Sequence, residues 1–153
     1  MPQTRRWFSG AETGDTSELE TVGSGMSVQR SVVRTGQYAY RVTASAGTSR
    51  MISGLNADQW TIREYFQISG APTASSTFLK EFDAALAIRL IAQLTTGRVI
   101  RVQDNGVTLG LVAINGTTVL NTGQWYLVEV FLDVAAGGIV RVLLNGMPEI
   151  ETT

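Results

Sequence analysis

The chain has 153 residues, of which 44% are hydrophobic and 16% charged, and its formal net charge is −1. It contains no cysteine and no histidine, which excludes disulfides, cysteine-ligated metals and any catalytic site of the Cys–His or Ser–His–Asp type. A chain of this length fits one domain and can bury roughly 70% of its unfolded surface without a metal or a disulfide.

The basic residues are scattered along the sequence, and Lys80 is the only lysine. Nucleic-acid binding favours a basic stripe, so we expect no nucleic-acid partner. The first eight residues include Arg5 and Arg6 but no apolar segment follows them, and we therefore expect no secretory signal. No run approaches 18 apolar residues, which argues against a membrane span. These features predict a chain that is made in the cytosol, or carried out as part of a larger particle.

The first third of the chain alternates strand and loop patterns. Residues 5–8 fit a short first strand, and residues 9–19 are rich in Gly, Ser, Thr and acidic residues, which predicts a loop. Strands are predicted over residues 26–33 and 38–44. In the second of these strands, Tyr38, Tyr40 and Val42 lie on one face.

The central third contains one clear strand and one ambiguous segment. Residues 60–69 alternate, with Glu64 as the charged residue on an otherwise apolar face. Residues 79–94 are rich in good helix formers, although the apolar residues from Leu86 to Leu94 also recur two apart. We favour strand over helix there, because Thr95-Thr96-Gly97 turns directly into a further strand at residues 98–103.

The last third predicts a series of hairpins. Asp104-Asn105-Gly106 and Asn115-Gly116 are turn sequences on either side of an apolar strand at residues 107–114. Residues 124–134 and 139–145 form the two arms of a hairpin, and residues 147–153 form a last strand or tail. Many short strands separated by Gly and Asn turns predict an antiparallel sandwich or barrel.

The two faces of the arm at residues 124–134 differ in character. One face is apolar throughout and consists of Tyr126, Val128, Val130, Leu132 and Val134. On the other face, Glu129 and Asp133 interrupt Trp125, Leu127 and Phe131, which predicts a partly solvated side.

The sequence Gly123-Gln124-Trp125-Tyr126, the strand that follows, Asp133, Gly137-Gly138 and Asn145-Gly146 together resemble the concanavalin A-like jelly roll of the laminin-G type. Residues 8–15 and 34–42 are similar to the openings of many jelly-roll domains in phage, bacterial and carbohydrate-binding proteins. The resemblance covers most of the chain and implies an all-β, two-sheet antiparallel jelly-roll sandwich. It divides the chain into an N-terminal arm or first strand at residues 1–8 and a single jelly-roll domain at residues 9–153.

The superfamily includes lectins, glycosidases, peptide binders and virion proteins, so the fold alone does not give the function. A glycosidase of this fold needs two carboxylates about 5 Å apart, and the usual Glu-x-Asp-x-x-Glu motif is missing, so we expect no enzyme. Our first hypothesis is a structural protein of a phage-type virion, either a capsid decoration protein or a tail- or fibre-associated subunit. It would be made in the host cytoplasm and bind other copies of itself, in a trimer for example, as well as a major capsid or tail protein. The alternative is a carbohydrate-binding module.

Three acidic residues, Glu12, Asp15 and Glu18, form a cluster in the predicted loop and are the calcium candidates. The competing interpretation is that they solvate the loop or cap a turn, and no other cofactor is expected. For glycan binding the candidate rings are Trp60 and Tyr38. All three rings, those of Trp60, Tyr38 and Trp125, lie in predicted strands, which favours core packing over a glycan platform for each of them.

Overall fold

The structure, a computed structural model, describes residues 14–15, 26–42, 59–82, 88–104, 113–133 and 138–152. The chain divides into two compact units, Met1–Leu55 and Asn56–Thr153. Every regular element in the described ranges is a β-strand, and every strand pairing is antiparallel. This confirms the prediction of an all-β protein.

In the first unit, β1 (Met26–Gln29) pairs with β2 (Ala39–Val42), and Val28 lies opposite Tyr40. The predicted strand at residues 26–33 is thus confirmed over its first four residues. It ends early because the chain bends over residues 30–37, where Gly36 has a φ of 79°.

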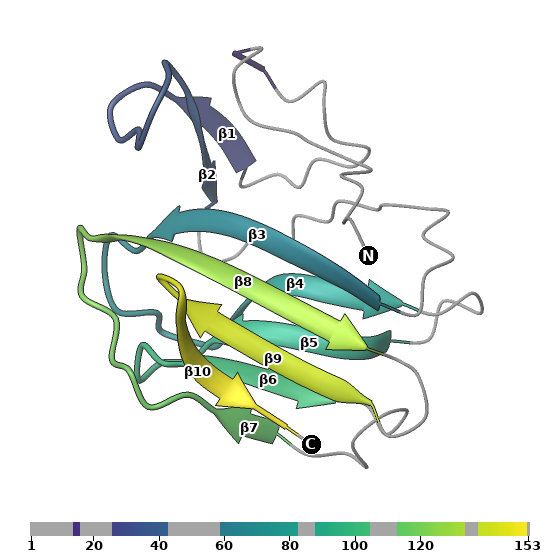
Figure 1. The fold of residues 1–153 in the computed structure, drawn as a ribbon. Coiled ribbons are helices and arrows are strands. Elements are labelled where there is room, and N and C mark those ends of the chain that lie inside the picture. The colour runs from purple at the N-terminus through teal and green to yellow at the C-terminus, as the bar shows by residue number, and fades with distance from the viewer. Residues whose placement is uncertain are drawn as a thin grey trace. The chain divides into compact units, whose positions relative to one another are not determined.

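The second unit contains two four-stranded sheets (Figure 1). One has the order β10-β9-β8-β3 and is called the β8 sheet below; the other has the order β4-β5-β6-β7 and is called the β5 sheet. The strands are β3 (Gln59–Gln67), β4 (Ser76–Phe82), β5 (Ile88–Leu94), β6 (Ile100–Asp104), β7 (Ala113–Asn115), β8 (Trp125–Asp133), β9 (Ile139–Leu144) and β10 (Met147–Glu151).

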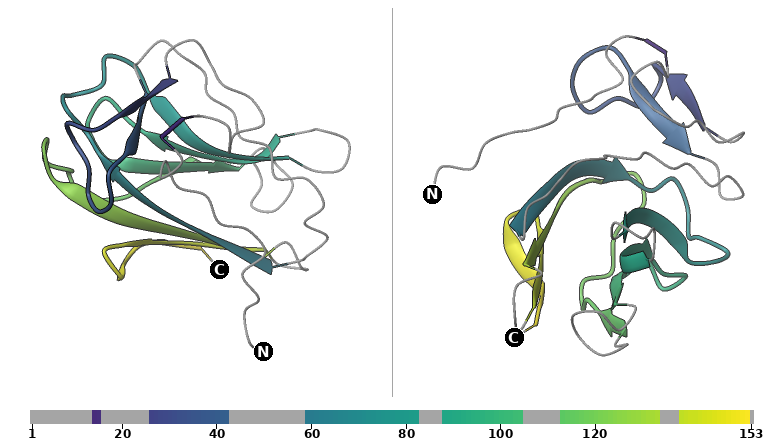
Figure 2. Two further views of the ribbon diagram at one scale, coloured as in Figure 1. Left: turned by 90° about the horizontal axis from the view of Figure 1, so that it is seen from above. Right: turned by 90° about the vertical axis from the view of Figure 1, so that its right-hand side faces the viewer.

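The connections place distant segments of the chain side by side. Strands β4 to β7 pair in chain order, as do β8 to β10, whereas β3 pairs with β8 over nine residues although the whole β5 sheet separates them in sequence. The segments β3–β4 and β7–β8 therefore cross from one sheet to the other. The result is two antiparallel layers, as in a β-sandwich (Figure 2, right).

The core lies between these layers. Alternate residues of β8 are buried, and both sheets contribute to one apolar cluster, including Leu90 and Val102 from the β5 sheet and Val130 and Val142 from the β8 sheet. Burying each such side chain stabilises the fold by roughly 1.5–3 kcal/mol. The predicted apolar face of residues 126–132 is confirmed, since all four of its described members are buried.

The ambiguous segment at residues 79–94 is strand wherever the structure describes it. It forms two strands rather than one, because β4 and β5 run antiparallel with Lys80 opposite Ile91. Residues 83–87 between them lie outside the described ranges. A single strand over the whole segment would exceed the usual length of about 3–10 residues.

The turn predicted at residues 145–146 is confirmed, whereas the turn predicted at residues 115–116 begins with a residue that is still part of a strand. Asn145 and Gly146 have φ values of 52° and 82° and join β9 to β10 as a two-residue turn of the type I′ class. Asn115, by contrast, lies in β7 opposite Arg101. Its Oδ1 accepts a hydrogen bond of 2.8 Å from Arg101 Nε, so this side chain adds a contact to the last residue pair of β6 and β7.

Candidate binding face

The surface of the β8 sheet that points away from the core is the candidate site. We call it the outer face. Its residues are Gln59, Thr61, Arg63, Tyr65 and Gln67 of β3, Trp125, Leu127, Glu129, Phe131 and Asp133 of β8, Ile139, Arg141 and Leu143 of β9, and Glu151 of β10.

Polar residues of this face are paired across the strands. Arg63 and Glu129 lie opposite each other in the register, and Arg63 Nε is 2.8 Å from Glu129 Oε1. Gln59 lies opposite Asp133 and donates a hydrogen bond of 2.6 Å from Nε2 to Oδ2. The side chain of Glu129 is only 17% exposed whereas that of Arg63 is 60% exposed, so the arginine covers the carboxylate.

Two further polar contacts complete the pattern. Gln67 donates from Nε2 to the carbonyl oxygen of Gly123 at 2.9 Å, which ties the end of β3 to the segment before β8. On the other side of β8, Arg141 of β9 donates to Oε1 of Glu151 on β10 through both Nε and a terminal nitrogen. The polar groups of the outer face therefore bond largely to one another.

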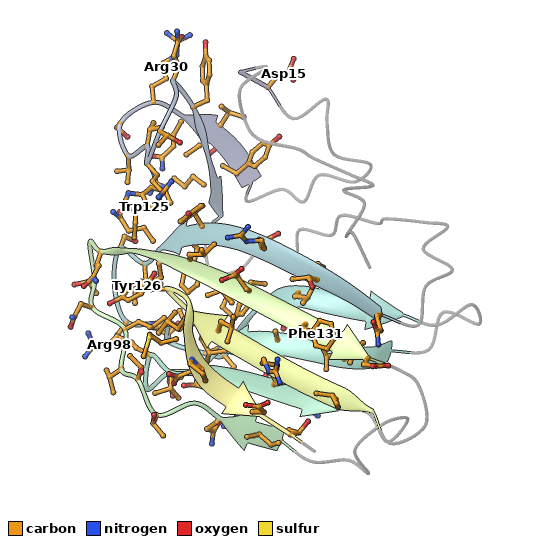
Figure 3. The ribbon with its side chains drawn as sticks, in the orientation of Figure 1. Asp15, Arg30, Arg98, Trp125, Tyr126 and Phe131 are labelled. Carbon is orange, nitrogen blue, oxygen red and sulfur yellow. The ribbon has the colours of Figure 1, made fainter. Side chains whose placement is uncertain are left out.

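Apolar and aromatic residues occupy the positions between these pairs. Thr61 lies opposite Phe131, and Tyr65 lies opposite Leu127. The side chains of Trp125, Leu127 and Phe131 are half-buried, and Tyr65 is 47% exposed. Trp125 and Phe131 lie toward opposite ends of β8 (Figure 3). The strand thus presents apolar and acidic side chains in alternation from Leu127 to Asp133, with a second apolar residue, Trp125, at its start.

The segment that crosses from β7 to β8 anchors one end of the face. Glu149 of β10 accepts hydrogen bonds from Thr118 N and Thr118 Oγ1, both of 2.7 Å. Gly116 lies against this carboxylate, because a Cβ at that position would stand 2.2 Å from Glu149 Oε1. Asn121 N donates to the hydroxyl of Tyr126 at 2.7 Å, and Gly123 N donates to Ile68 O at 2.9 Å. This network positions Trp125 at the start of β8.

The sequence predicted that β8 has one apolar face and one partly solvated face, but it did not predict which strands complete the outer face. The half-buried pattern of residues 125–133 confirms a partly solvated side. The partners Arg63 and Tyr65 were missed, because nothing local in the sequence indicates that β3 pairs with β8. Two residues of opposite charge at matched positions of two alternating strands, here Arg63 and Glu129, are the signal that could have found the pairing.

The position of Trp125 corrects one interpretation. The sequence favours core packing for this ring, but Trp125 lies on the outer face opposite Gln67. Its neighbour Tyr126 is 4% exposed and belongs to the core instead. The physical reason is that successive side chains of a strand point to opposite faces of the sheet, so Trp125 and Tyr126 cannot both lie in the core.

The residues expected to bind calcium are only partly described. Asp15 is exposed, while Glu12 and Glu18 lie outside the described residues. In the part of the chain that the structure describes, no group of three or more His, Cys, Asp or Glu side chains could hold a metal ion.

Of the two glycan candidates, Trp60 lies in β3 opposite Leu132, and its side chain is outside the described part of the structure. Tyr38 is half-buried and precedes β2. The guanidinium carbon of Arg30 lies 4.6 Å from the centre of the Tyr38 ring, and Arg30 donates a hydrogen bond to the Tyr38 hydroxyl. The ring also lies against Gly14, where a Cβ would stand 2.9 Å from Tyr38 Cζ. Tyr38 is thus packed by its own unit on two sides.

Within the described ranges, no helix is both long and apolar enough to cross a membrane. No protein-family model, no curated protein and no solved structure matches this chain.

Proposed function

We propose that the chain is a non-enzymatic structural subunit of a phage-type virion, a capsid decoration protein or a tail- or fibre-associated subunit, which acts through protein–protein contacts. The jelly-roll topology implied by the sequence resemblance is part of this proposal. The partners are other copies of the chain in a symmetric homo-oligomer and a major capsid or tail protein, and the outer face is the contact surface.

One observation carries the proposal. The outer face combines half-buried Trp125, Leu127 and Phe131 with arginines and carboxylates that are already paired with each other. Aromatic residues and arginine are enriched in protein interfaces, and they supply most of the binding energy at the centre of such contacts. Paired polar groups also lose less on burial, because they keep their hydrogen bonds when water is removed.

The same pairing argues for a protein partner over a sugar. A glycan is recognised through its hydroxyls, which need polar side chains that are free to bond with them. On the outer face, Gln59 and Gln67 direct their amide nitrogens to Asp133 and to the Gly123 carbonyl. An apolar protein surface fits such a face better than a hydroxyl-rich ligand.

The test is the oligomeric state of the purified chain, measured by sedimentation velocity over a range of concentrations. We expect the wild-type chain to form a homo-oligomer. Phe131→Glu should weaken association by ~10-fold or more, because assembly would bury an unpaired charge. Met147→Glu is the matched control, since Met147 is 69% exposed at the β9–β10 turn and is not part of the outer face. A monomeric wild type, or a Phe131→Glu variant that associates normally, would contradict the proposal.

The carbohydrate-binding alternative is favoured by the three rings of Trp125, Tyr65 and Phe131 on one sheet surface. A glycan array separates it from the assembly function. Dose-dependent binding that is lost in Trp125→Ala, Trp60→Ala or Tyr38→Ala would support the alternative.

A further inference from the structure

We propose that β3 is a dimerisation edge, along which β3 of a second copy pairs antiparallel so that the two β8 sheets form one continuous sheet. β3 is the last strand in the order β10-β9-β8-β3, and in the described part of the chain no strand pairs with its other side (Figure 1). An edge contact adds to the proposed function, because it joins copies in pairs and leaves the outer face exposed for a further contact.

The other three sheet edges of the second unit each have a feature that hinders the addition of a strand. β10 contains Pro148, which has no backbone N–H, and its register shifts between Pro148 and Ile150. β4 has two register shifts, and β7 has only three residues. β3 is nine residues long, contains no proline and pairs with β8 in an unbroken register. Prolines, bulges and short length protect edge strands from pairing, so β3 is the least protected of these edges.

The backbone of β3 presents hydrogen-bonding groups to this edge. The hydrogen bond from Asn145 N to Leu127 O shows that the backbone groups of Leu127 point toward β9. The direction alternates from residue to residue, so the even-numbered residues of β8 bond to the even-numbered residues of β3 that lie opposite them. The odd-numbered residues of β3, among them Thr61 and Arg63, therefore direct their N–H and C=O groups away from β8. Both of these residues are exposed.

The sequence of β3 selects one register for the pair. In an antiparallel pair of identical strands, the residue on the two-fold axis lies opposite its own copy. An axis at Arg63 or Glu64 puts like charges directly opposite each other, which is destabilising. An axis at Ile62 instead puts Ile62 opposite Ile62 of the second copy, and Thr61 opposite Arg63 of the second copy. This register pairs residues 59–65 of each copy, and it is the longest in which no charged residue lies opposite itself.

The charge of Arg63 is already balanced within each copy. Its Nε lies 2.8 Å from Oε1 of Glu129. With the axis at Ile62, the two copies of Arg63 are diagonal neighbours across the contact, about 7–8 Å apart. Each keeps its own Glu129, so the ion pair reduces the repulsion between the two arginines.

Thr61→Pro tests the contact in the full chain. It removes an N–H that points to the edge and none that bonds to β8, and proline is tolerated at such a position of an edge strand. In sedimentation velocity we expect wild-type pairs, and a dissociation constant raised by ~10-fold or more in Thr61→Pro, because each copy loses one hydrogen bond to the other. Thr61→Ala is the matched control, which keeps the N–H and should pair like the wild type. Equal association of the two variants would overturn the edge contact.

Single cysteines test the register, since the natural chain has none. Ile62→Cys brings two thiols face to face in a pair without backbone hydrogen bonds, where opposite side chains are closest. Glu64→Cys is the control on the same side of β3, and its two copies lie four residues apart along the strands, about 13 Å. Under mild oxidation we expect disulfide-linked dimers to form on the order of 10-fold faster with Ile62→Cys. Equal rates, or a faster rate with Glu64→Cys, would contradict the proposed pairing.

The two contact surfaces are distinguished by comparing Thr61→Pro with Phe131→Glu. If Phe131→Glu separates the copies and Thr61→Pro does not, the outer face is the contact and the β3 edge is not. If only Thr61→Pro separates them, the edge contact stands and the assembly role of the outer face fails. A wild type that is monomeric at every concentration contradicts both.

Discussion

Asn145 shows how one residue can join a turn to the neighbouring strand. Its φ of 52° suits the type I′ turn, and asparagine tolerates this left-handed conformation better than most residues. Its backbone N donates to Leu127 O at 2.8 Å, and its Oδ1 accepts from Leu127 N at 2.9 Å. The side chain therefore continues the pairing of β8 with β9 one residue beyond the last backbone pair.

Asn145→Ala should lower the free energy of unfolding by about 2–3 kcal/mol, through about 1–2 kcal/mol of left-handed strain and about 1 kcal/mol for the lost hydrogen bond. Asn145→Gly is the matched control, because glycine accepts the positive φ and loses only the side-chain bond. It should cost about 1 kcal/mol. Urea titrations of both variants measure the difference, and equal losses would show that the backbone conformation contributes nothing.

Glu149 and Gly116 also depend on each other, because the Glu149 carboxylate lies directly against the glycine. The carboxylate is held by Thr118 and occupies the space where a side chain at position 116 would lie. Gly116→Ala should therefore displace the carboxylate and cost about 1–2 kcal/mol, as much as Glu149→Ala, since both break the same bonds. A double-mutant cycle measures the coupling: in the Glu149→Ala background, Gly116→Ala should cost little. Additive losses would mean that the glycine is required for another reason.

At the scale of the element, the turn between β5 and β6 is strained because a residue other than glycine has a positive φ. Thr95 N donates to Val99 O and Arg98 N donates to Thr95 O, which closes a tight turn with Arg98 at a φ of 61°. The Arg98 carbonyl accepts from Leu120 N at 2.9 Å, so the crossing segment fixes this conformation. The glycine of this turn stands one position earlier, at Gly97, where no positive φ occurs.

Arg98→Gly should raise the free energy of unfolding by about 0.5–1 kcal/mol, because relief of about 1–2 kcal/mol of left-handed strain outweighs the greater flexibility of glycine in the unfolded chain. Arg98→Ala is the control that removes the side chain and keeps the strain, and it should leave stability nearly unchanged. Thermal and urea unfolding of the pair measures the effect. An equal gain in both variants would assign it to the arginine side chain instead of the backbone.

The elements of this fold were predictable where their residues alternate. The period of two is enough to assign Val128 and Val130 to a buried face and Phe131 to a solvated one, and the burial of β8 follows this pattern. Strand ends were less predictable, because they depend on partners distant in the sequence. Asn115 is still part of β7, as its last residue, since it pairs with Arg101, and β1 ends where its pairing with β2 ends. The candidate face was predictable for β8 alone, because the pairing of β3 with β8 depends on the tertiary fold.

At the scale of the whole molecule, the β8 sheet depends on the pairing of β3 with β8, two strands that all of the β5 sheet separates in sequence. β3 meets β8 only after the four strands of the β5 sheet have been passed in sequence. Such non-local pairings are costly in chain entropy and form slowly compared with hairpins. The hairpins β8–β9 and β5–β6 supply local pairings, while the outer face is complete only when β3 is added.

The core predicts which part of the chain can fold alone. Among the described residues, the buried apolar side chains of the main cluster all lie between Ile68 and Ile150, inside the unit Asn56–Thr153. We therefore expect residues 56–153 to fold without the preceding unit and to show dispersed amide resonances and one cooperative unfolding transition. Val130→Asp in the same fragment is the control that should abolish both features, because it places an unpaired charge at a position that is 2% exposed. A fragment with collapsed amide dispersion would show that the sandwich requires the first unit, and that its core alone does not offset the conformational entropy lost on folding.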